Sequence, residues 1–146
     1  MSRSVHVATE GVRIAVARDR VASLAERVLR AERVRDASIS IAFVTDRRIA
    51  ALNREHLGHT GPTDVISFGF RPVGATADVV GDVYIAPAVA RRNARAHGGR
   101  VREELLRLVV HGVLHVVGHD HPEDDSRYHS RMWKRQEHLL RTLGAA

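Results

Sequence analysis

Hydrophobic and polar residues alternate with a period of two in several short segments, and this pattern predicts strands. In one such segment Ile39, Ile41 and Phe43 alternate with smaller residues, which is typical of a strand with one covered face. Further strands are predicted at residues 5–16, with a break at Gly11, at 65–70 and at 78–85. The chain therefore has the segments needed for a four-stranded sheet.

Other segments repeat their hydrophobic residues every three or four positions, which predicts amphipathic helices. The first such stripe consists of Val21, Leu24, Ala25 and Val28. Three more helices are indicated by boundary residues and by the apolar positions between them. The first has Thr45 or Asp46 as its N-cap, Ile49, Leu52 and Leu57 on its apolar face and Gly58 as its stop. The second has Pro87 in its first turn and a stop near Gly98 and Gly99. The third covers residues 123–143, with Pro122 before an acidic first turn.

The helix predicted at residues 101–117 is apolar around most of its circumference, so we expect it in the centre of the fold. Its apolar residues are Leu105, Leu106, Leu108, Val109, Val110, Val113, Leu114, Val116 and Val117. A narrow polar stripe interrupts them, because Glu104, Arg107, His111 and His115 fall in one sector at about 100° per residue. Burying two imidazoles costs free energy unless another group satisfies them.

Histidines are concentrated in the run HGVLHVVGHDH, residues 111–121. His111 and His115 are four positions apart and project from one helical face, as in helical two-histidine zinc sites. Gly118 permits a left-handed turn that ends the helix and returns the chain towards this pair. A third ligand beyond the turn would complete a metal site; the longer excursion favours His121 over His119, but the spacing leaves both open. Three imidazoles leave a fourth position for water, whose pKa falls to about 7 on zinc, which is typical of a hydrolytic site.

The neighbours of these histidines limit the chemistry. Gly112 stands where His-Glu-x-x-His peptidases have their general base, so a peptidase of that design is not expected. Asp120 or Asp124 could orient an imidazole or assist proton transfer. For Asp124, capping the final helix is the simpler role.

The composition narrows the classes of function further. The chain has 146 residues and no cysteine, which is typical of one domain and excludes disulfides, thiolate zinc sites and thiol nucleophiles. Any metal must therefore be bound by nitrogen and oxygen. No apolar run has the length of a signal peptide core or a membrane span, so we expect a cytoplasmic protein with no membrane partner.

The charge is basic, with 23 Lys+Arg against 17 Asp+Glu and a formal net charge of +6. Spacings of three and four place several cations on one helical face, as expected of a polyanion contact, although a solvated face is the simpler interpretation. The two basic clusters are Arg91, Arg92, Arg95 and Arg100, and Arg127, Arg131, Lys134 and Arg135.

The histidine run resembles the signature His-Gly-x-Leu-His-x-x-Gly-Tyr-Asp-His of the YbeY family, bacterial single-domain endoribonucleases that act as ribosomal RNA maturation factors. LNREHLGHTGPTDVISF at 52–68, GDVYIA at 81–86 and MWKRQEHLLRTLG at 132–144 resemble further segments of the family in the same order. The resemblance implies an α+β fold with a mixed sheet beside the histidine-bearing helix. It also implies one zinc ion bound by His111, His115 and His121, and association with RNA, with the small ribosomal subunit and with an assembly GTPase.

Several positions depart from the family pattern. His56 and Leu57 stand where many members have an aromatic residue followed by an arginine that is thought to contribute to RNA processing. Arg107 is a candidate substitute for that arginine, although pairing with Glu103 or Glu104 is the simpler role. Two smaller differences are His119 in place of the family tyrosine and Ala86 in place of a common serine.

The sequence therefore predicts one α+β domain over residues 1–146, with a mixed four-stranded sheet, about five helices and the histidine pair on the central apolar helix. We expect a single-strand-specific, metal-dependent endoribonuclease that acts late in ribosome maturation. Its expected tasks are processing the 3′ end of the 16S rRNA precursor and ribosome quality control, with Arg107 and Asp120 as candidate catalytic residues. The alternatives are a ribosome assembly or RNA-binding factor with a mainly structural metal and little turnover, and a metallohydrolase for another substrate.

Overall fold

A mixed four-stranded sheet and five helices make up the part of the chain that this computed structural model describes, residues 2–70, 78–120 and 130–144. In chain order the elements are β1 (Arg3–Thr9), α1 (Arg18–Ala31), β2 (Ala37–Phe43), α2 (Asp46–Leu57), β3 (Val65–Phe70), β4 (Val79–Ile85), α3 (Pro87–Ala96), α4 (Val101–Val116) and α5 (Arg131–Leu143). The predicted α+β fold is confirmed. None of the helices within these residues combines the length and apolarity needed to cross a membrane.

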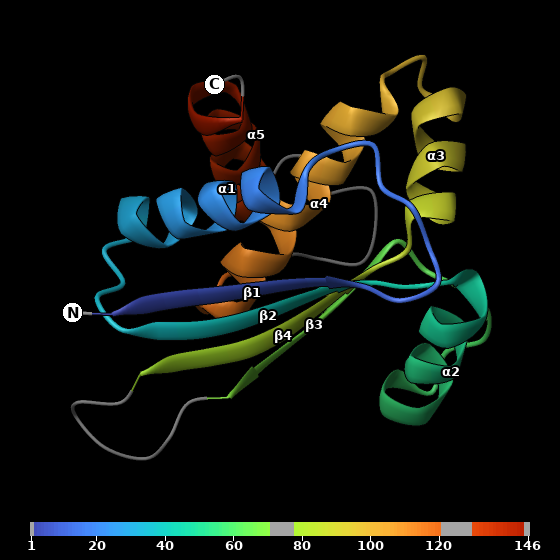
Figure 1. The fold of residues 1–146 in the computed structure, drawn as a ribbon, viewed down its shortest axis with the longest axis horizontal. Helices are drawn as coiled ribbons and strands as arrows, with labels where there is room; N and C mark the ends of the chain where they lie inside the picture. The colour runs from blue at the N-terminus through green and yellow to red at the C-terminus, as the bar shows by residue number, and fades with distance from the viewer. Residues whose placement is uncertain (1, 71–77, 121–129, 145–146) are drawn as a thin grey trace.

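The sheet has the strand order β1-β2-β4-β3, in which β1, β2 and β4 are parallel and β3 is antiparallel to β4. Val7, Ile41 and Val83 are register partners across the three parallel strands. Helices α1 and α4 lie over one face of the sheet with α5 next to them, and α2 lies on the opposite face (Figure 1). The histidine-bearing helix α4 therefore packs on the sheet and is in contact with three other helices, α1, α3 and α5.

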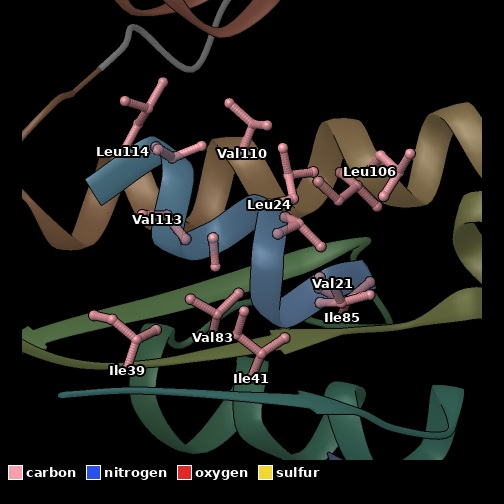
Figure 2. Packing of buried hydrophobic residues seen from close by; sticks show 14 of the residues in the cluster. Val21, Leu24, Ile39, Ile41, Val83, Ile85, Leu106, Val110, Val113 and Leu114 are labelled. Atoms are coloured by element: carbon pink, nitrogen blue, oxygen red, sulfur yellow. The ribbon is translucent and has the colours of Figure 1, made fainter. Parts of the chain in front are cut away.

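The core forms where α1 and α4 meet β2 and β4. Figure 2 shows Ile39, Ile41, Val83 and Ile85 pointing from the strands towards the two helices. Each fully buried aliphatic side chain contributes about 1.5–3 kcal/mol to folding, so α4 is held firmly on the sheet. The buried residues of α4 are Leu105, Leu106, Leu108, Val109, Val110, Gly112, Val113, Leu114 and Val116.

Two glycines allow α4 to lie close to the sheet. A Cβ atom at Gly112 would be 2.5 Å from Val83 Cγ1 and 3.3 Å from Ser67 Oγ. A Cβ atom at Gly81 on β4 would be 2.4 Å from Val116 Cγ1. Contacts this short are repulsive, so any larger residue would push α4 away from β3 and β4.

The predicted first strand is too long. β1 ends at Thr9, the Glu10 amide donates to the Phe43 carbonyl, and Gly11 has a φ of 68°. Val12 and Ile14 continue the alternating pattern because they pack against the core, but no strand includes them. Alternating burial of side chains therefore produces the sequence pattern of a strand at these positions, although the backbone forms no sheet hydrogen bonds there.

Two other expectations need correction, one on the start of α5 and one on the burial of Leu57. α5 begins at Arg131 rather than at residue 123, because Ser130 is extended and its hydroxyl accepts a hydrogen bond from the Trp133 amide; residues 121–129 lie outside the described part. Leu57, expected on the apolar face of α2, is 48% exposed. The expected caps of that helix are confirmed, with Thr45 accepting from the Arg48 amide and Gly58 ending the helix in the left-handed conformation.

Candidate metal centre

The polar stripe of α4 lines a pocket of about 950 Å³. Glu104, Arg107, His111 and His115 all contribute to its wall, as their helical spacing predicts. β3, α3 and α5 provide other parts of the wall. The apolar side of α4 faces the core, so the same helix that anchors the fold presents its polar groups to the pocket.

His111 and His115 lie side by side in this pocket. Their ring centroids are 4.8 Å apart and the rings meet edge to face, at 72°. Both side chains are partly buried. Two imidazoles on adjacent helical turns at this separation suit joint coordination of one ion, which requires both nitrogens to approach the metal to about 2.0–2.1 Å.

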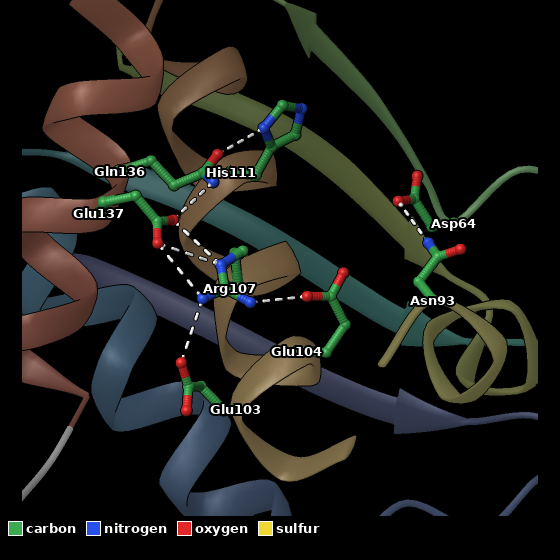
Figure 3. Close-up of polar contacts among 8 residues, drawn as sticks. All are labelled: Asp64, Asn93, Glu103, Glu104, Arg107, His111, Gln136 and Glu137. Atoms are coloured by element: carbon green, nitrogen blue, oxygen red, sulfur yellow. Dashed lines mark hydrogen bonds and ion pairs between the residues drawn. The ribbon is translucent and has the colours of Figure 1, made fainter. Parts of the chain in front are cut away.

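Gln136 of α5 contacts the first of these histidines. Its Oε1 lies 2.6 Å from His111 Nδ1, and its Nε2 donates to Glu137 Oε2 at 3.1 Å (Figure 3). An amide oxygen only accepts, so this contact requires a proton on Nδ1. A neutral imidazole in this state is the form that binds a metal, so the donor chemistry fits a zinc ion.

Gly118 ends α4 in the way the sequence predicts. Its φ is 114°, its amide donates to the His115 carbonyl at 3.0 Å, and the His119 amide donates to the Leu114 carbonyl at 2.9 Å. These two bonds form a Schellman motif, which satisfies carbonyls that the helix end would otherwise leave unpaired. The histidine pair thus occupies the last full turns before a tight reversal of the chain.

The two alternatives for a third ligand differ in what the structure describes. His119 Nε2 lies 2.5 Å from Glu32 Oε1 at the end of α1, and His119 does not line the pocket. His121 lies outside the described residues. Within residues 2–70, 78–120 and 130–144, no group of three histidine or acidic side chains is placed to hold a metal ion, so the third ligand stays a prediction.

Arg107 is engaged with protein carboxylates. Its Nε lies 3.0 Å from Glu137, its Nη1 lies 2.7 Å from Glu104 and its Nη2 lies 3.1 Å from Glu103 (Figure 3). The simpler of its two expected roles, pairing with Glu103 or Glu104, is confirmed. Its catalytic role stays a prediction, as does that of Asp120, which is exposed and lines the pocket.

Burial affects the charges of this cluster. Burial raises the pKa of Glu104 above its usual value, with a further contribution from the negative charge of Asp64, while Arg107 opposes the shift. Burial disfavours the charged form of Arg107, but hydrogen bonds with Glu137 and Glu104 raise its pKa. The guanidinium is therefore a permanent cation that offsets part of the negative charge of the three carboxylates around it.

A loop at residues 58–64 closes one side of the pocket. Asn53 Nδ2 donates to the Gly61 carbonyl at 2.9 Å, and Asn93 Nδ2 donates to Asp64 Oδ2 at 3.3 Å. The Ala86 amide donates to the Asp64 carbonyl at 2.9 Å. Asn53 of α2, Asn93 of α3 and Ala86 between β4 and α3 thus hold the loop in place.

Sequence reasoning missed Gln136, Asn53 and Asp64. A signal for Gln136 was present, because it occupies the buried stripe of α5 together with Met132, Leu139 and Leu140. A polar residue on such a stripe needs a hydrogen-bonding partner in the core. Asn53 and Asp64 lie in the segment 52–68 that resembles the family, but nothing in their spacing points to the loop they hold.

The basic clusters are partly paired within the protein. Arg92 Nη1 lies 3.1 Å from Asp46 Oδ2, and Arg135 Nη2 lies 2.8 Å from Glu32 Oε2. The described part of the chain shows no ion pair for the exposed residues Arg91, Arg95 and Arg100. Arg100 also lines the pocket; Arg127 lies outside the described residues.

Comparison with known proteins identifies the family. Residues 6–144 match the family model described as Endoribonuclease YbeY. The chain belongs to this family. The YbeY resemblance seen in the histidine run and in three other segments is therefore confirmed across almost the whole sequence.

Individual YbeY relatives show the same relationship. A protein of Halalkalibacterium halodurans named Endoribonuclease YbeY is 36% identical over 116 residues, which are 73% of this chain and 72% of that protein. A protein of the same name from an Anaeromyxobacter species is 43% identical over 110 residues, which are 75% of this chain but only 56% of that longer protein. The solution structure of TM1509 from Thermotoga maritima has a TM-score of 0.64 at 25% identity, covering 97% of this chain and 89% of that one.

The structure also locates the positions that depart from the YbeY pattern. Leu57 and His59 line the pocket beside the loop at 58–64, so the family arginine expected at position 57 is replaced by an exposed apolar side chain at the pocket wall. His119, in place of the family tyrosine, contacts Glu32. Ala86 is fully buried at the start of α3.

Proposed function

We propose that this protein is a metal-dependent endoribonuclease that cleaves single-stranded RNA. The observation that carries the proposal is the pair His111 and His115 in the pocket, with ring centroids 4.8 Å apart and His111 Nδ1 in contact with Gln136 Oε1. Membership of the YbeY family supports RNA as the substrate.

His111 and His115, with His121 as the predicted third ligand, would hold one zinc ion. When bound, zinc supplies a Lewis acid for a phosphoryl oxygen and lowers the pKa of water. The protein contributes a fixed pair of imidazoles on a helix that the core immobilises. Asp120, exposed at the pocket, is a candidate for moving a proton.

Cationic groups on α3 and at Arg100, together with an aromatic residue of the pocket wall, suit a single strand of RNA. Arg91, Arg95 and Arg100 are exposed without an ion pair to any described residue, so their guanidinium groups are available to phosphates. Trp133 lines the pocket, and aromatic side chains of this kind stack on unpaired bases. This combination favours a flexible strand over a duplex, whose bases are already stacked.

Ser67 is a further candidate for contact with substrate. Its Oγ is buried and has no hydrogen-bond partner in the described part of the chain, and the residue lines the pocket beside Gly112. A buried hydroxyl without a partner costs free energy. A phosphate oxygen or a ribose hydroxyl would satisfy it.

The cellular task that we propose follows from the family. It is late ribosome maturation in the cytoplasm, including processing of the 3′ end of the 16S rRNA precursor and ribosome quality control, in contact with the small ribosomal subunit and an assembly GTPase. Hydrolysis and attack by the RNA's own 2′-hydroxyl give different ends. End-group analysis of the products distinguishes them, because only the second leaves a 2′,3′-cyclic phosphate.

The test compares the wild-type protein with His115→Ala on single-stranded precursor RNA, with thermal unfolding measured in parallel. We expect the variant to lose cleavage while the metal-free proteins melt alike, because the His115 side chain lies at the pocket wall rather than in the core. No cleavage by either protein, with a large loss of stability in the zinc-loaded variant, would instead support the assembly factor with a structural metal. Cleavage of peptides or small esters but not RNA would support a different metallohydrolase.

A further inference from the structure

A continuous chain of polar contacts links the histidine pair to the interface of α4 and α5. Arg107 Nε lies 3.0 Å from Glu137 Oε2, that oxygen accepts from Gln136 Nε2 at 3.1 Å, and Gln136 Oε1 lies 2.6 Å from His111 Nδ1. Figure 3 shows these groups in sequence, with the second ring nitrogen of His111 on the side away from Gln136. This series of contacts therefore ends at His111 Nδ1, and Nε2, on the opposite side of the ring, is the nitrogen that would bind a metal.

Arg107, at the far end of this series of contacts from His111, fixes the direction of each hydrogen bond in it. Arg107 can only donate, so the Glu137 carboxylate accepts. The Gln136 amide must then turn its NH₂ group towards Glu137, which leaves its carbonyl oxygen facing His111. A carbonyl cannot donate, so His111 must carry its proton on Nδ1.

The surroundings oppose any other arrangement. Gln136 is 1% exposed, so water is not at hand to replace its partners. Glu104 and Glu103 hold the other two nitrogens of the Arg107 guanidinium. Reversing the Gln136 amide would set its carbonyl oxygen against the Glu137 carboxylate, which is repulsive whichever tautomer His111 adopts.

We propose that Gln136 is a positioning residue that locks His111 in the Nδ1–H tautomer and so presents Nε2 to the metal. Glu137 and Arg107 act through it by fixing the orientation of the amide. This inference rests on the proposed metal site. A metal binds through the lone pair of Nε2, so the tautomer of His111 decides whether that lone pair exists. The competing view is that Gln136 only joins α4 to α5 by packing.

The first measurement needs neither metal nor variant. Long-range ¹H–¹⁵N NMR spectra of the metal-free protein at about pH 8.5, well above the usual imidazole pKa, report which ring nitrogen carries the proton. We expect His111 as a single Nδ1–H tautomer. A predominant Nε2–H signal, or rapid averaging of the two forms, would overturn the proposal whether or not the protein cleaves RNA.

Variants then separate the hydrogen bond from packing. Gln136→Met keeps the length of the side chain and removes the acceptor, so we expect mixed tautomers at His111 and a zinc affinity reduced about 10- to 100-fold, the usual effect of losing such an outer contact. The double variant Gln136→Glu, Glu137→Gln exchanges the two groups, so an acceptor oxygen still faces His111 and an amide rather than a second carboxylate lies next to it. It should restore both the Nδ1–H tautomer and most of the affinity. Equal loss in both variants would support packing alone.

Asn53→Leu is the matched control. Asn53 is also a buried amide at the pocket wall, 5% exposed, but its side chain donates to the Gly61 carbonyl in the loop at 58–64 and not to a histidine. We expect its replacement to lower the melting temperature without changing the His111 tautomer. If Gln136→Met does no more than this control, the positioning role is wrong; a locked tautomer in a protein that binds no zinc would instead contradict the proposed function.

Discussion

Gly112 on α4 faces Val83 on β4 so closely that a Cβ atom at position 112 would lie 2.5 Å from Val83 Cγ1. This contact fixes the distance between the histidine-bearing helix and the sheet. His111 immediately precedes Gly112 in α4. The position of His111 relative to β3 therefore depends on the absence of a side chain at Gly112.

Replacing Gly112 with alanine should therefore destabilise the fold. Overpacking costs about 1–3 kcal/mol, which offsets the helix-propensity gain of about 1 kcal/mol from Gly to Ala. Chemical denaturation measures the difference. Gly99→Ala is the control, because nothing lies within 4 Å of a Cβ at that position; equal stability of the two variants would contradict the close contact.

Arg107→Met should destabilise the protein by about 1–3 kcal/mol, because it leaves partly buried carboxylates without their cation. The side chains of Glu104 and Glu137 are only 15% and 22% exposed. Arg30→Met removes a comparable i,i+4 contact with Glu26 between side chains that are 68% and 44% exposed, and should cost about 0.5 kcal/mol or less. Similar losses in the two variants, measured by denaturant unfolding, would show that the Arg107 cluster adds no more than a surface pair.

Glu104 should make stability depend on pH in a defined direction. Burial raises its pKa in the folded state, so the folded protein binds this proton at a higher pH than the unfolded chain does. The carboxyl has no effect where both states are protonated, and it destabilises the fold increasingly as pH rises above the usual glutamate pKa of about 4.3. The stability of Glu104→Gln relative to wild type should therefore grow over this range; a constant or shrinking difference would contradict the shift.

Arg95 and Arg92 should differ in their contribution to RNA binding, although they lie on the same helix. Arg92 already pairs with Asp46, whereas Arg95 pairs with no described residue. Arg95→Met should weaken binding of single-stranded RNA and reduce the slope of log affinity against log salt by about 0.7, the value for one phosphate contact. Arg92→Met should change the slope less, and an equal change in both would argue against α3 as a phosphate-binding surface.

The elements that sequence reasoning located well are those with strong local signals. α4 was identified because apolar residues surround it, and its polar stripe because four residues share one helical sector. Gly118 was recognised as the helix stop because only glycine adopts the required φ readily. Such features depend on the chain within one or two turns.

The features that sequence reasoning missed depend on residues distant in the chain. Val12 and Ile14 follow the pattern of a strand because both pack against the core while the residues around them are exposed. The pairing of β1 with β2 has already ended at the hydrogen bond from the Glu10 amide to the Phe43 carbonyl. Gln136 reaches His111 across 25 positions, and periodicity within α5 cannot identify that partner. Long-range packing therefore decides both the strand boundary and the support of the histidine pair.

The most direct test of the account is a zinc titration of chelator-stripped protein, following cleavage of single-stranded RNA. The account predicts no cleavage before zinc is added, a rise that saturates near one equivalent per chain, and no recovery at any zinc concentration in a His111→Ala, His115→Ala double variant. Undiminished cleavage by the stripped protein, or equal recovery in the double variant, would contradict a catalytic metal at this histidine pair.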